Sequence, residues 1–192
     1  MKRRLLLKAF TVAGLAPIAG CAVGSNGKPR TESDAEGPYY PVVDMPLDIS
    51  LITGDMFVGD ELLFTGRVLD QAGRTLENVK VEIWQCDGNS IYSHPRAPQS
   101  ENKDLNFRGF GAMFSSVTGA YEFRTIVPVA YSGRPPHIHV KLLRDGHELL
   151  TTQIYLEGQK GSNDRKIKPE VTGKNDIAKN LTRYEATFDF VI

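Results

Sequence analysis

Residues 137–156 read HIHVKLLRDGHELLTTQIYL, and they are the strongest indication of the fold class. Two runs of apolar and β-branched residues flank Asp145-Gly146, a dipeptide strongly favoured in two-residue hairpin turns. We therefore expect two antiparallel strands, residues 137–144 and 148–156. Alternate residues of a strand point to the same face, so His137 and His139 should share one face while Ile138 occupies the other.

Period-two alternation recurs along the rest of the chain. It predicts further strands at 61–69, 79–84, 121–125 and 184–190. No long segment has the 3.6-residue period of a helix, and residues 87–118 and 158–181 show neither pattern. Loops of that length are usually functional or mobile. We expect an all-β fold, an antiparallel β-sandwich of the immunoglobulin-like or prealbumin-like kind with long active-site loops.

The N-terminus resembles an export signal. Lys2-Arg3-Arg4 precedes an apolar stretch from Leu5 to Ala19, which is shorter than the roughly 20 residues of a membrane span. Ile18-Ala-Gly-Cys21 resembles a lipobox, in which the cysteine is lipidated, and Arg3-Arg4 resembles a twin-arginine signal. We expect an exported protein, periplasmic or membrane-anchored through a lipid on Cys21.

This interpretation divides the chain into three segments. Residues 1–21 are the expected export or lipoprotein signal. Residues 22–35 are small and polar, which is typical of a flexible tether. Residues 36–192 are left as one β-sandwich domain, long enough for a substantial core.

Charge and cysteine content exclude some classes of function. The chain has 23 basic and 23 acidic residues, and removal of the signal with its four basic residues leaves 19 basic against 23 acidic. A mildly acidic domain argues against nucleic acid as a partner. There are two cysteines; if Cys21 carries lipid, Cys86 has no disulfide partner and should be a small buried hydrophobe.

Two tyrosines precede the histidine pair, Tyr131 six residues before His137 and Tyr92 further upstream. Imidazole binds several transition metals, whereas phenolate is a hard anionic donor that favours a highly charged ion such as Fe(III). Two tyrosines with two histidines would therefore suggest a non-haem ferric centre. Taken singly, these residues are equally compatible with structural roles, or with a copper or zinc site to which His94 contributes.

Other motifs follow one another in a consistent order. They are Glu36-Gly-Pro-Tyr-Tyr40, Val81-Glu-Ile-Trp-Gln-Cys-Asp87, Ile91-Tyr-Ser-His94, Asp104-Leu-Asn-Phe-Arg-Gly-Phe-Gly111, Gly119-Ala-Tyr-Glu-Phe-Arg-Thr-Ile126, Tyr131-Ser-Gly-Arg-Pro-Pro-His-Ile-His139 and Gln153-Ile-Tyr-Leu-Glu-Gly158. Together they resemble the intradiol ring-cleavage dioxygenases, the family of protocatechuate and catechol dioxygenases. The resemblance covers about two-thirds of the chain.

The resemblance implies a ligand set. Tyr92, Tyr131, His137 and His139 would bind the ferric ion, with a solvent-derived hydroxide completing the site. Tyr131 would be the axial tyrosine that swings away when substrate chelates the metal. Tyr92 would remain bound.

The resemblance also implies a reaction. The partners would be a small catechol substrate and O2, and the product a cis,cis-muconate-type diacid. Arg134 would lie over the substrate ring and stabilise its developing charge, Gln153 would approach from the neighbouring strand, and Tyr131 would accept a substrate proton. A homo-oligomer is compatible with the resemblance.

The chain departs from the better-known members of that family at two points. No long helical segment precedes the β domain, and Ser132 stands where a proline often occurs. The walls of the substrate pocket are therefore not predicted. The alternative is a non-enzymatic exported β-sandwich lipoprotein used for binding, because a fold does not fix a function.

Overall fold

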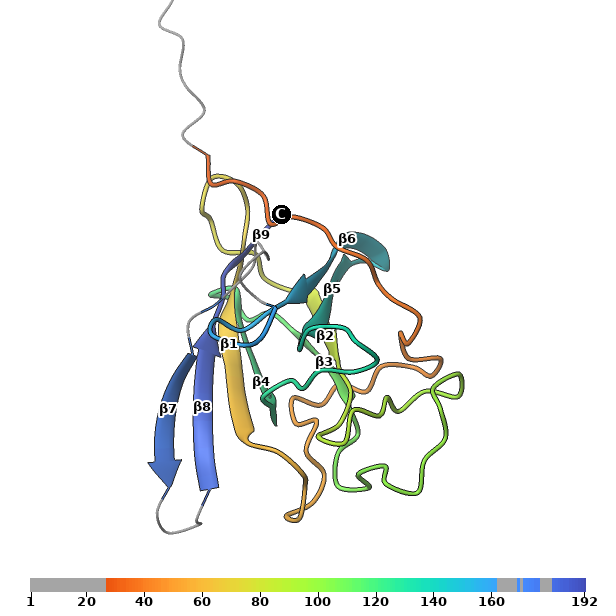
Figure 1. Cartoon of the computed structure of the whole chain (residues 1–192). Helices are drawn as coiled ribbons and strands as arrows, with labels where there is room; N and C mark the ends of the chain where they lie inside the picture. The colour runs from red at the N-terminus through yellow and green to blue at the C-terminus, as the bar shows by residue number, and fades with distance from the viewer. Residues whose placement is uncertain (1–26, 162–168, 170, 177–180) are drawn as a thin grey trace, which may run out of the picture.

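The computed structural model describes residues 27–161, 169, 171–176 and 181–192, so the expected signal and residues 22–26 of the expected tether lie outside the described residues. Two β-sheets form the domain (Figure 1). The strands are β1 (Glu61–Leu69), β2 (Lys80–Trp84), β3 (Phe110–Phe114), β4 (Ala120–Ile126), β5 (Ile138–Arg144), β6 (His147–Ile154), β7 (Val171–Asp176), β8 (Leu181–Thr187) and β9 (Phe190–Val191). The expected all-β sandwich is confirmed. Within the described ranges, no helix is long and apolar enough to cross a membrane.

The four-stranded sheet, in the order β3-β2-β5-β6, contains the predicted hairpin. β5 and β6 are antiparallel, with His139 opposite Gln153. Asp145 and Gly146 have φ angles of 52° and 79°, as a type I′ turn requires at both central positions. β3 lies inside residues 87–118, for which no strand was predicted. Its buried residues are Gly111 and Ala112, which are too small to produce an apolar alternation.

The other sheet has the order β4-β1-β8-β7, and β9 also pairs with β1. β1 is antiparallel to β4 but parallel to β8 and β9, so the sandwich is rich in antiparallel pairs without being wholly antiparallel. Parallel neighbours need a long connection, and here most of the chain separates β1 from β8. The single strand expected at 184–190 is divided between β8 and β9, and β7 lies within residues 158–181, which were expected to be irregular.

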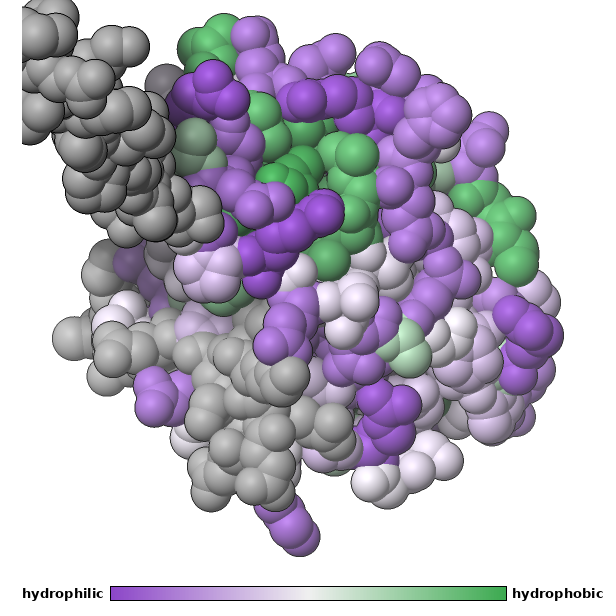
Figure 2. Space-filling view, turned by 90° about the horizontal axis from the view of Figure 1, so that it is seen from above, coloured by the Kyte–Doolittle hydropathy of each residue, from purple (hydrophilic) through white to green (hydrophobic). Residues whose placement is uncertain are grey.

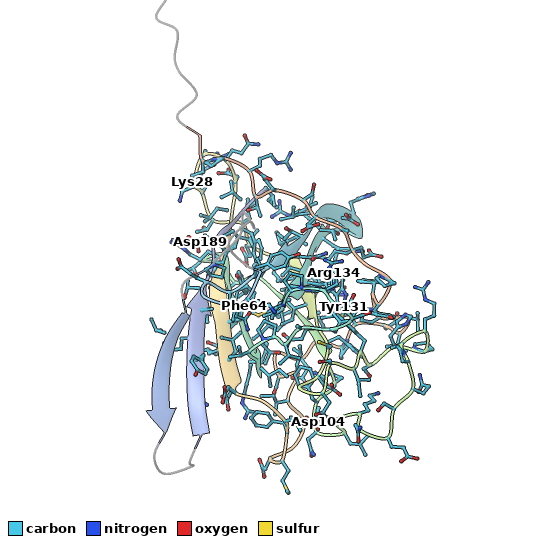
Figure 3. The ribbon with its side chains drawn as sticks, viewed as in Figure 1. Lys28, Phe64, Asp104, Tyr131, Arg134 and Asp189 are labelled. Carbon is cyan, nitrogen blue, oxygen red and sulfur yellow. The ribbon has the colours of Figure 1, made fainter. Side chains whose placement is uncertain are left out.

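The apolar core lies between the two sheets. Phe64 on β1 and Phe123 on β4 meet Ile83 on β2 and Val140 on β5, and all four side chains are completely buried. Phe64 lies near the centre of the molecule in Figure 3. The alternate residues of β2 and β5 therefore point away from this core, onto the outer face of the four-stranded sheet.

Residues 28–35 form an extended segment that runs from β9 to β6, the edge strand of the four-stranded sheet. Asp34 N donates to Thr151 O at 3.0 Å, Thr152 Oγ1 donates to Glu32 O at 2.8 Å, and Thr31 N donates to Val191 O at 2.8 Å. This part of the expected tether is thus hydrogen-bonded to the domain. Its polar composition did not reveal this because backbone groups make most of the bonds. Figure 2 views the molecule from the top of Figure 1, and there hydrophilic residues surround a smaller hydrophobic area.

Candidate metal centre

The outer face of the four-stranded sheet carries a row of three residues on neighbouring strands. Trp84 on β2 lies opposite His139 on β5, which lies opposite Gln153 on β6. His137 immediately precedes β5, and both histidines are only 2% exposed. The two imidazoles face each other, with their Nε2 atoms 3.1 Å apart.

Hydrogen bonding fixes the protonation of one imidazole. His137 Nδ1 lies 2.6 Å from Pro135 O, and a carbonyl can only accept, so Nδ1 carries a proton and Nε2 is the nitrogen that could bind a metal. Nitrogen ligands lie about 2.0–2.1 Å from a metal ion such as zinc, so two that meet at one ion near a right angle are about 3 Å apart. The Nε2 atoms of His137 and His139 have this separation.

Two tyrosine rings close the arrangement. Tyr92 lies 4.9 Å from Tyr131 between ring centroids, and Tyr131 lies 5.8 Å from His137. The two histidine rings are 4.7 Å apart, and His139 lies 6.1 Å from Tyr92. The four predicted ligands thus form a closed cycle of ring contacts, although they come from three separate parts of the chain.

The loop after β2 positions Tyr92. The Asp87 carboxylate accepts hydrogen bonds from the backbone N–H groups of Asn89, Ile91 and Asp104, each at 2.8–2.9 Å. A single buried carboxylate therefore organises both ends of the loop, in the manner of an Asx turn. Tyr92 follows directly and is 5% exposed.

A tight turn positions Tyr131. Arg134 N donates to Tyr131 O at 2.7 Å, and Ser132 and Gly133 have φ angles of 45° and 78°. Ser132 and Gly133 are exposed and Tyr131 is half-buried, in contrast to Tyr92. Figure 3 shows Tyr131 and Arg134 close together, whereas Asp104 lies in the loops at the far end of the molecule.

Burial sets the protonation of these groups in the absence of a metal. It raises the pKa of Tyr92 far above its ordinary value, with smaller contributions from Cys86 and Tyr131. It also raises the pKa of Tyr131, which Arg134 opposes. For His139, burial, then His137 and Arg134, lower the pKa to about 2. A neutral His139 is a competent ligand, but either tyrosinate would need a nearby cation.

Arg134 and Gln153 form a hydrogen-bonded group beside the histidines. Arg134 Nη2 donates to Gln153 Oε1 at 2.8 Å, and Tyr155 OH donates to the same oxygen at 2.5 Å. Gln153 Nε2 donates to Ala35 O at 2.6 Å. The Tyr155 ring lies 5.7 Å from His137. Sequence reasoning did not assign Tyr155 a role, although it is two residues from Gln153 on the same face of the chain.

Two further aromatic residues that sequence reasoning left without a role enclose the site. Trp84 stacks on His139 with ring centroids 4.8 Å apart and planes 5° from parallel. Tyr39 packs against Tyr92 at 4.8 Å and Tyr131 at 6.0 Å. Both residues belong to motifs of the resemblance, and a period-two pattern alone could place Trp84 on the face of His139.

The residues fit a metal ion bound through nitrogen and phenolate oxygen. Within the described ranges, no three His, Cys, Asp or Glu side chains gather where they could hold a metal, so the tyrosines are needed to complete a ligand set. The buried Tyr92 OH has no hydrogen-bond partner in the described part of the chain. Phenolate with imidazole suits Fe(III). His94 lies outside the cycle of ring contacts: among the described residues its ring contacts Tyr39, with centroids 5.6 Å apart, and its Nδ1 accepts a hydrogen bond from Arg96 N at 3.0 Å.

Comparison with known sequences identifies relatives of this chain. A family model described as Dioxygenase matches residues 35–192. The protocatechuate 3,4-dioxygenase beta chain of Burkholderia cepacia is 35% identical over 138 residues, which cover 65% of this chain and 59% of the relative. Catechol 1,2-dioxygenase of Acinetobacter baylyi is 33% identical over 154 residues, which cover 69% of this chain and 47% of the relative. The chain thus spans about half the length of these curated relatives.

Solved structures resemble the fold as well. The dioxygenase domain of a dioxygenase and carbohydrate-binding fusion from a cellulolytic Streptomyces superposes with a TM-score of 0.67 and 31% identity, covering 85% of this chain and 98% of that one. Catechol 1,2-dioxygenase from Pseudomonas arvilla gives a TM-score of 0.67 at 26% identity, covering 86% of this chain and 62% of that one.

Proposed function

Because the chain belongs to the intradiol ring-cleavage dioxygenase family, we propose that it cleaves the aromatic ring of catechol-type substrates with O2 between the two hydroxyl-bearing carbons. The products would be cis,cis-muconate-type diacids. The closed cycle of Tyr92, Tyr131, His137 and His139 carries this proposal, because these four donors converge in one buried place. Family membership favours this enzyme over a non-enzymatic binding lipoprotein.

The four residues of the cycle would hold a non-haem ferric ion. When bound, Fe(III) would supply the Lewis acidity that lets a catechol bind through both oxygens and react with O2. The imidazole of His139 is available in neutral form, and the ferric charge would offset the cost of ionising the buried Tyr92 and the half-buried Tyr131.

Tyr131 and Tyr92 have different roles in this proposal because their surroundings differ. Tyr131 is half-buried on an exposed turn, so its phenolate oxygen can accept a proton from a catechol hydroxyl and turn toward solvent. Tyr92 is buried under Tyr39 and is held by the Asp87-organised loop, so it keeps its place. Tyr131 would act as a base, and Tyr92 would act as a fixed ligand.

Arg134 would stabilise negative charge on the substrate. Its guanidinium donates a hydrogen bond to Gln153 Oε1, which also accepts one from Tyr155 OH. A fixed cation in a site shielded from water stabilises charge that develops in the transition state. Gln153 and Tyr155 thus orient Arg134.

Oxygen uptake against a panel of catechols tests the activity. The iron-loaded protein should consume O2 with at least one catechol and release a ring-opened diacid, identified by mass spectrometry with both oxygen atoms of ¹⁸O2 incorporated at the cleaved bond. His137→Ala should lack this activity, whereas His147→Ala, which changes an exposed histidine of the hairpin turn, should retain it. A folded, iron-loaded protein that consumes no O2 with any catechol would contradict the proposal.

We also propose that the enzyme works outside the cytoplasm and that a lipid on Cys21 anchors it. Lys2-Arg3-Arg4 and Ile18-Ala-Gly-Cys21 support this proposal, and a twin-arginine route would allow iron loading before export. Extracytoplasmic catechols from lignin or humic material would then be substrates. Cell fractionation should find the native protein with the membrane and Cys21→Ser released from it. Full-length protein in the cytoplasm would contradict the proposal.

A further inference from the structure

The two histidines of the site are held by different means. His137 Nδ1 donates to Pro135 O, but the buried Nδ1 of His139 has no hydrogen-bond partner among the described residues. The indole Nε1 of Trp84, on which His139 stacks, likewise has none there. Metal-binding histidines usually gain their orientation from a hydrogen bond at the second ring nitrogen. The orientation of His139 must therefore come from packing.

Tyr40 fixes the other side of that packing. Its ring meets Trp84 edge to face, with centroids 5.0 Å apart and an interplanar angle of 83°. Its hydroxyl donates to Glu82 Oε2 at 2.7 Å, and the ammonium of Lys141 lies 4.0 Å from the centre of its ring. Glu82 and Lys141 are 2% and 7% exposed, so both charges act on Tyr40 with little screening by water.

The residues around Tyr40 form a strap, residues 36–40, across this face of the sheet. Glu36 pairs with Lys141, and Arg96 Nη2 donates to Pro38 O at 2.7 Å. The strap passes so close to the site that a Cβ on Gly37 would lie 3.1 Å from His139 Cε1. Gly37 also has a φ angle of 77°, which strongly favours glycine. Trp84 therefore contacts the His139 ring, and the strap passes close enough to leave little room for a side chain at Gly37.

We propose that Tyr40 is a positioning residue that keeps His139 in its metal-binding orientation by fixing Trp84 and the strap. Tyr40 packs against a small cluster that contains Trp84 and Tyr92 and is separate from the main core. That this orientation matters for iron binding rests on the proposed function. The packing of Tyr40 against Trp84 does not depend on the proposed function.

Trp84 is the only tryptophan of the chain, so its fluorescence reports this packing in the metal-free protein. Tyr40→Leu removes the ring and should make Trp84 more accessible to acrylamide, with a red-shifted emission maximum. Tyr184→Leu, the matched control, removes a half-buried ring that packs on the main core and should change neither property. Equal fluorescence and quenching in Tyr40→Leu and the wild type overturns the proposal.

Iron release measures the consequence in the holoprotein. Mutation of a residue that orients a metal ligand typically weakens metal binding about 10–100-fold, so Tyr40→Leu should lose iron to excess EDTA faster by a factor of that order. Tyr40→Phe keeps the ring and should recover most of the retention. Iron loss from Tyr40→Leu no faster than from Tyr184→Leu overturns the proposal.

A second variant covers failure of Tyr40→Leu to fold. Lys141→Met removes both the ammonium over the Tyr40 ring and the partner of Glu36, yet keeps an apolar stem of similar length. It should also raise quenching of Trp84 and speed iron release, and wild-type values in both measurements overturn the proposal. If the wild type binds no iron, the proposed function fails, while the fluorescence comparison still decides the role of Tyr40.

Discussion

The two faces of the four-stranded sheet are both buried, but they are built from different chemistry. On the inner face, Ile83 and Val140 pack against the other sheet in the main hydrophobic core. On the outer face, Trp84 and His139 come from the same strands, at alternate positions, and lie beneath loops and the strap. One pair of strands thus separates stability from function by the direction in which each side chain points.

The outer face is also the more costly of the two to bury. Glu82 and Lys141 lie in the row next to Trp84 and His139, and burial of a charge is unfavourable unless it is paired. Each is paired: Glu82 with Lys80 at 2.7 Å, and Lys141 with Glu36. The inner face should therefore dominate the free energy of unfolding, whereas changes on the outer face should act on the site.

The largest effect is expected for His139→Ala on the outer face. Loss of one of four ligands, at a position whose side chain adds nothing to the main core, should abolish iron binding and turnover while the metal-free protein stays folded. Iron content and the urea unfolding midpoint of metal-free samples measure the two effects. A variant that retains stoichiometric iron would remove His139 from the ligand set.

A change at Arg134 should act on the reaction alone. Arg134→Met should lower kcat by about 10²–10³-fold, the usual loss when one group that stabilises developing charge is removed. Iron content and visible colour should persist because Arg134 is not a ligand. Arg144→Met, which changes an arginine at the end of β5, serves as the control. Equal kcat values for Arg134→Met and wild type would exclude the electrostatic role.

The converse is expected on the inner face. Ile83→Ala, at a completely buried position, should lower the free energy of unfolding by about 2–5 kcal/mol, the range found when large aliphatic residues in cores are truncated. At low temperature the folded fraction should still bind iron with wild-type colour. If the variant loses a larger fraction of its iron than of its folded protein, the effects of the two faces are not separable.

A smaller effect concerns Cys86, which packs with Trp84 and Tyr92 behind the site. Burial, then the charge of Asp87, raises the pKa of its thiol to about 12 from the ordinary 9.0. The thiol of the unfolded chain ionises at a lower pH than the thiol of the folded chain. The free energy of unfolding is therefore at its full value below pH 9 and falls as the pH rises toward 12. Between pH 8 and pH 10.5 the wild type should lose about 1–2 kcal/mol more unfolding free energy than Cys86→Ala. Identical pH profiles would refute the shift.

Much of the sheet with the site could be predicted from sequence because its signals are local. Asp145-Gly146 supplied the turn, and alternation on either side placed Ile138 and Val140 in the core opposite His139. β3 and β7 were missed. β3 buries Gly111 and Ala112, which carry little apolar signal, and β7 lies in a polar stretch, where its pairing with β8 supplies the strand bonds.

The site could likewise be predicted only in part, because several of its contacts join residues that are far apart in the sequence. The pairing of His137 with His139 follows from strand geometry, but nothing in the spacing of Tyr92 places it beside them, because a loop organised by Asp87 does so. Its grouping with the histidines came from family resemblance. The strap was missed entirely: Tyr40 reaches Glu82 and Lys141 from 42 and about 100 residues away, and such contacts leave no periodic trace.

The visible spectrum of the iron-loaded protein tests the outer-face site most directly. Phenolate bound to ferric iron gives a red-brown charge-transfer band, so the wild type should be coloured, and Tyr131→Phe and Tyr92→Phe should each shift or weaken the band. Tyr184→Phe, on β8, should leave it unchanged. A colourless iron-loaded protein, or a band that neither Tyr92→Phe nor Tyr131→Phe alters, would contradict a ferric site with two tyrosinate ligands.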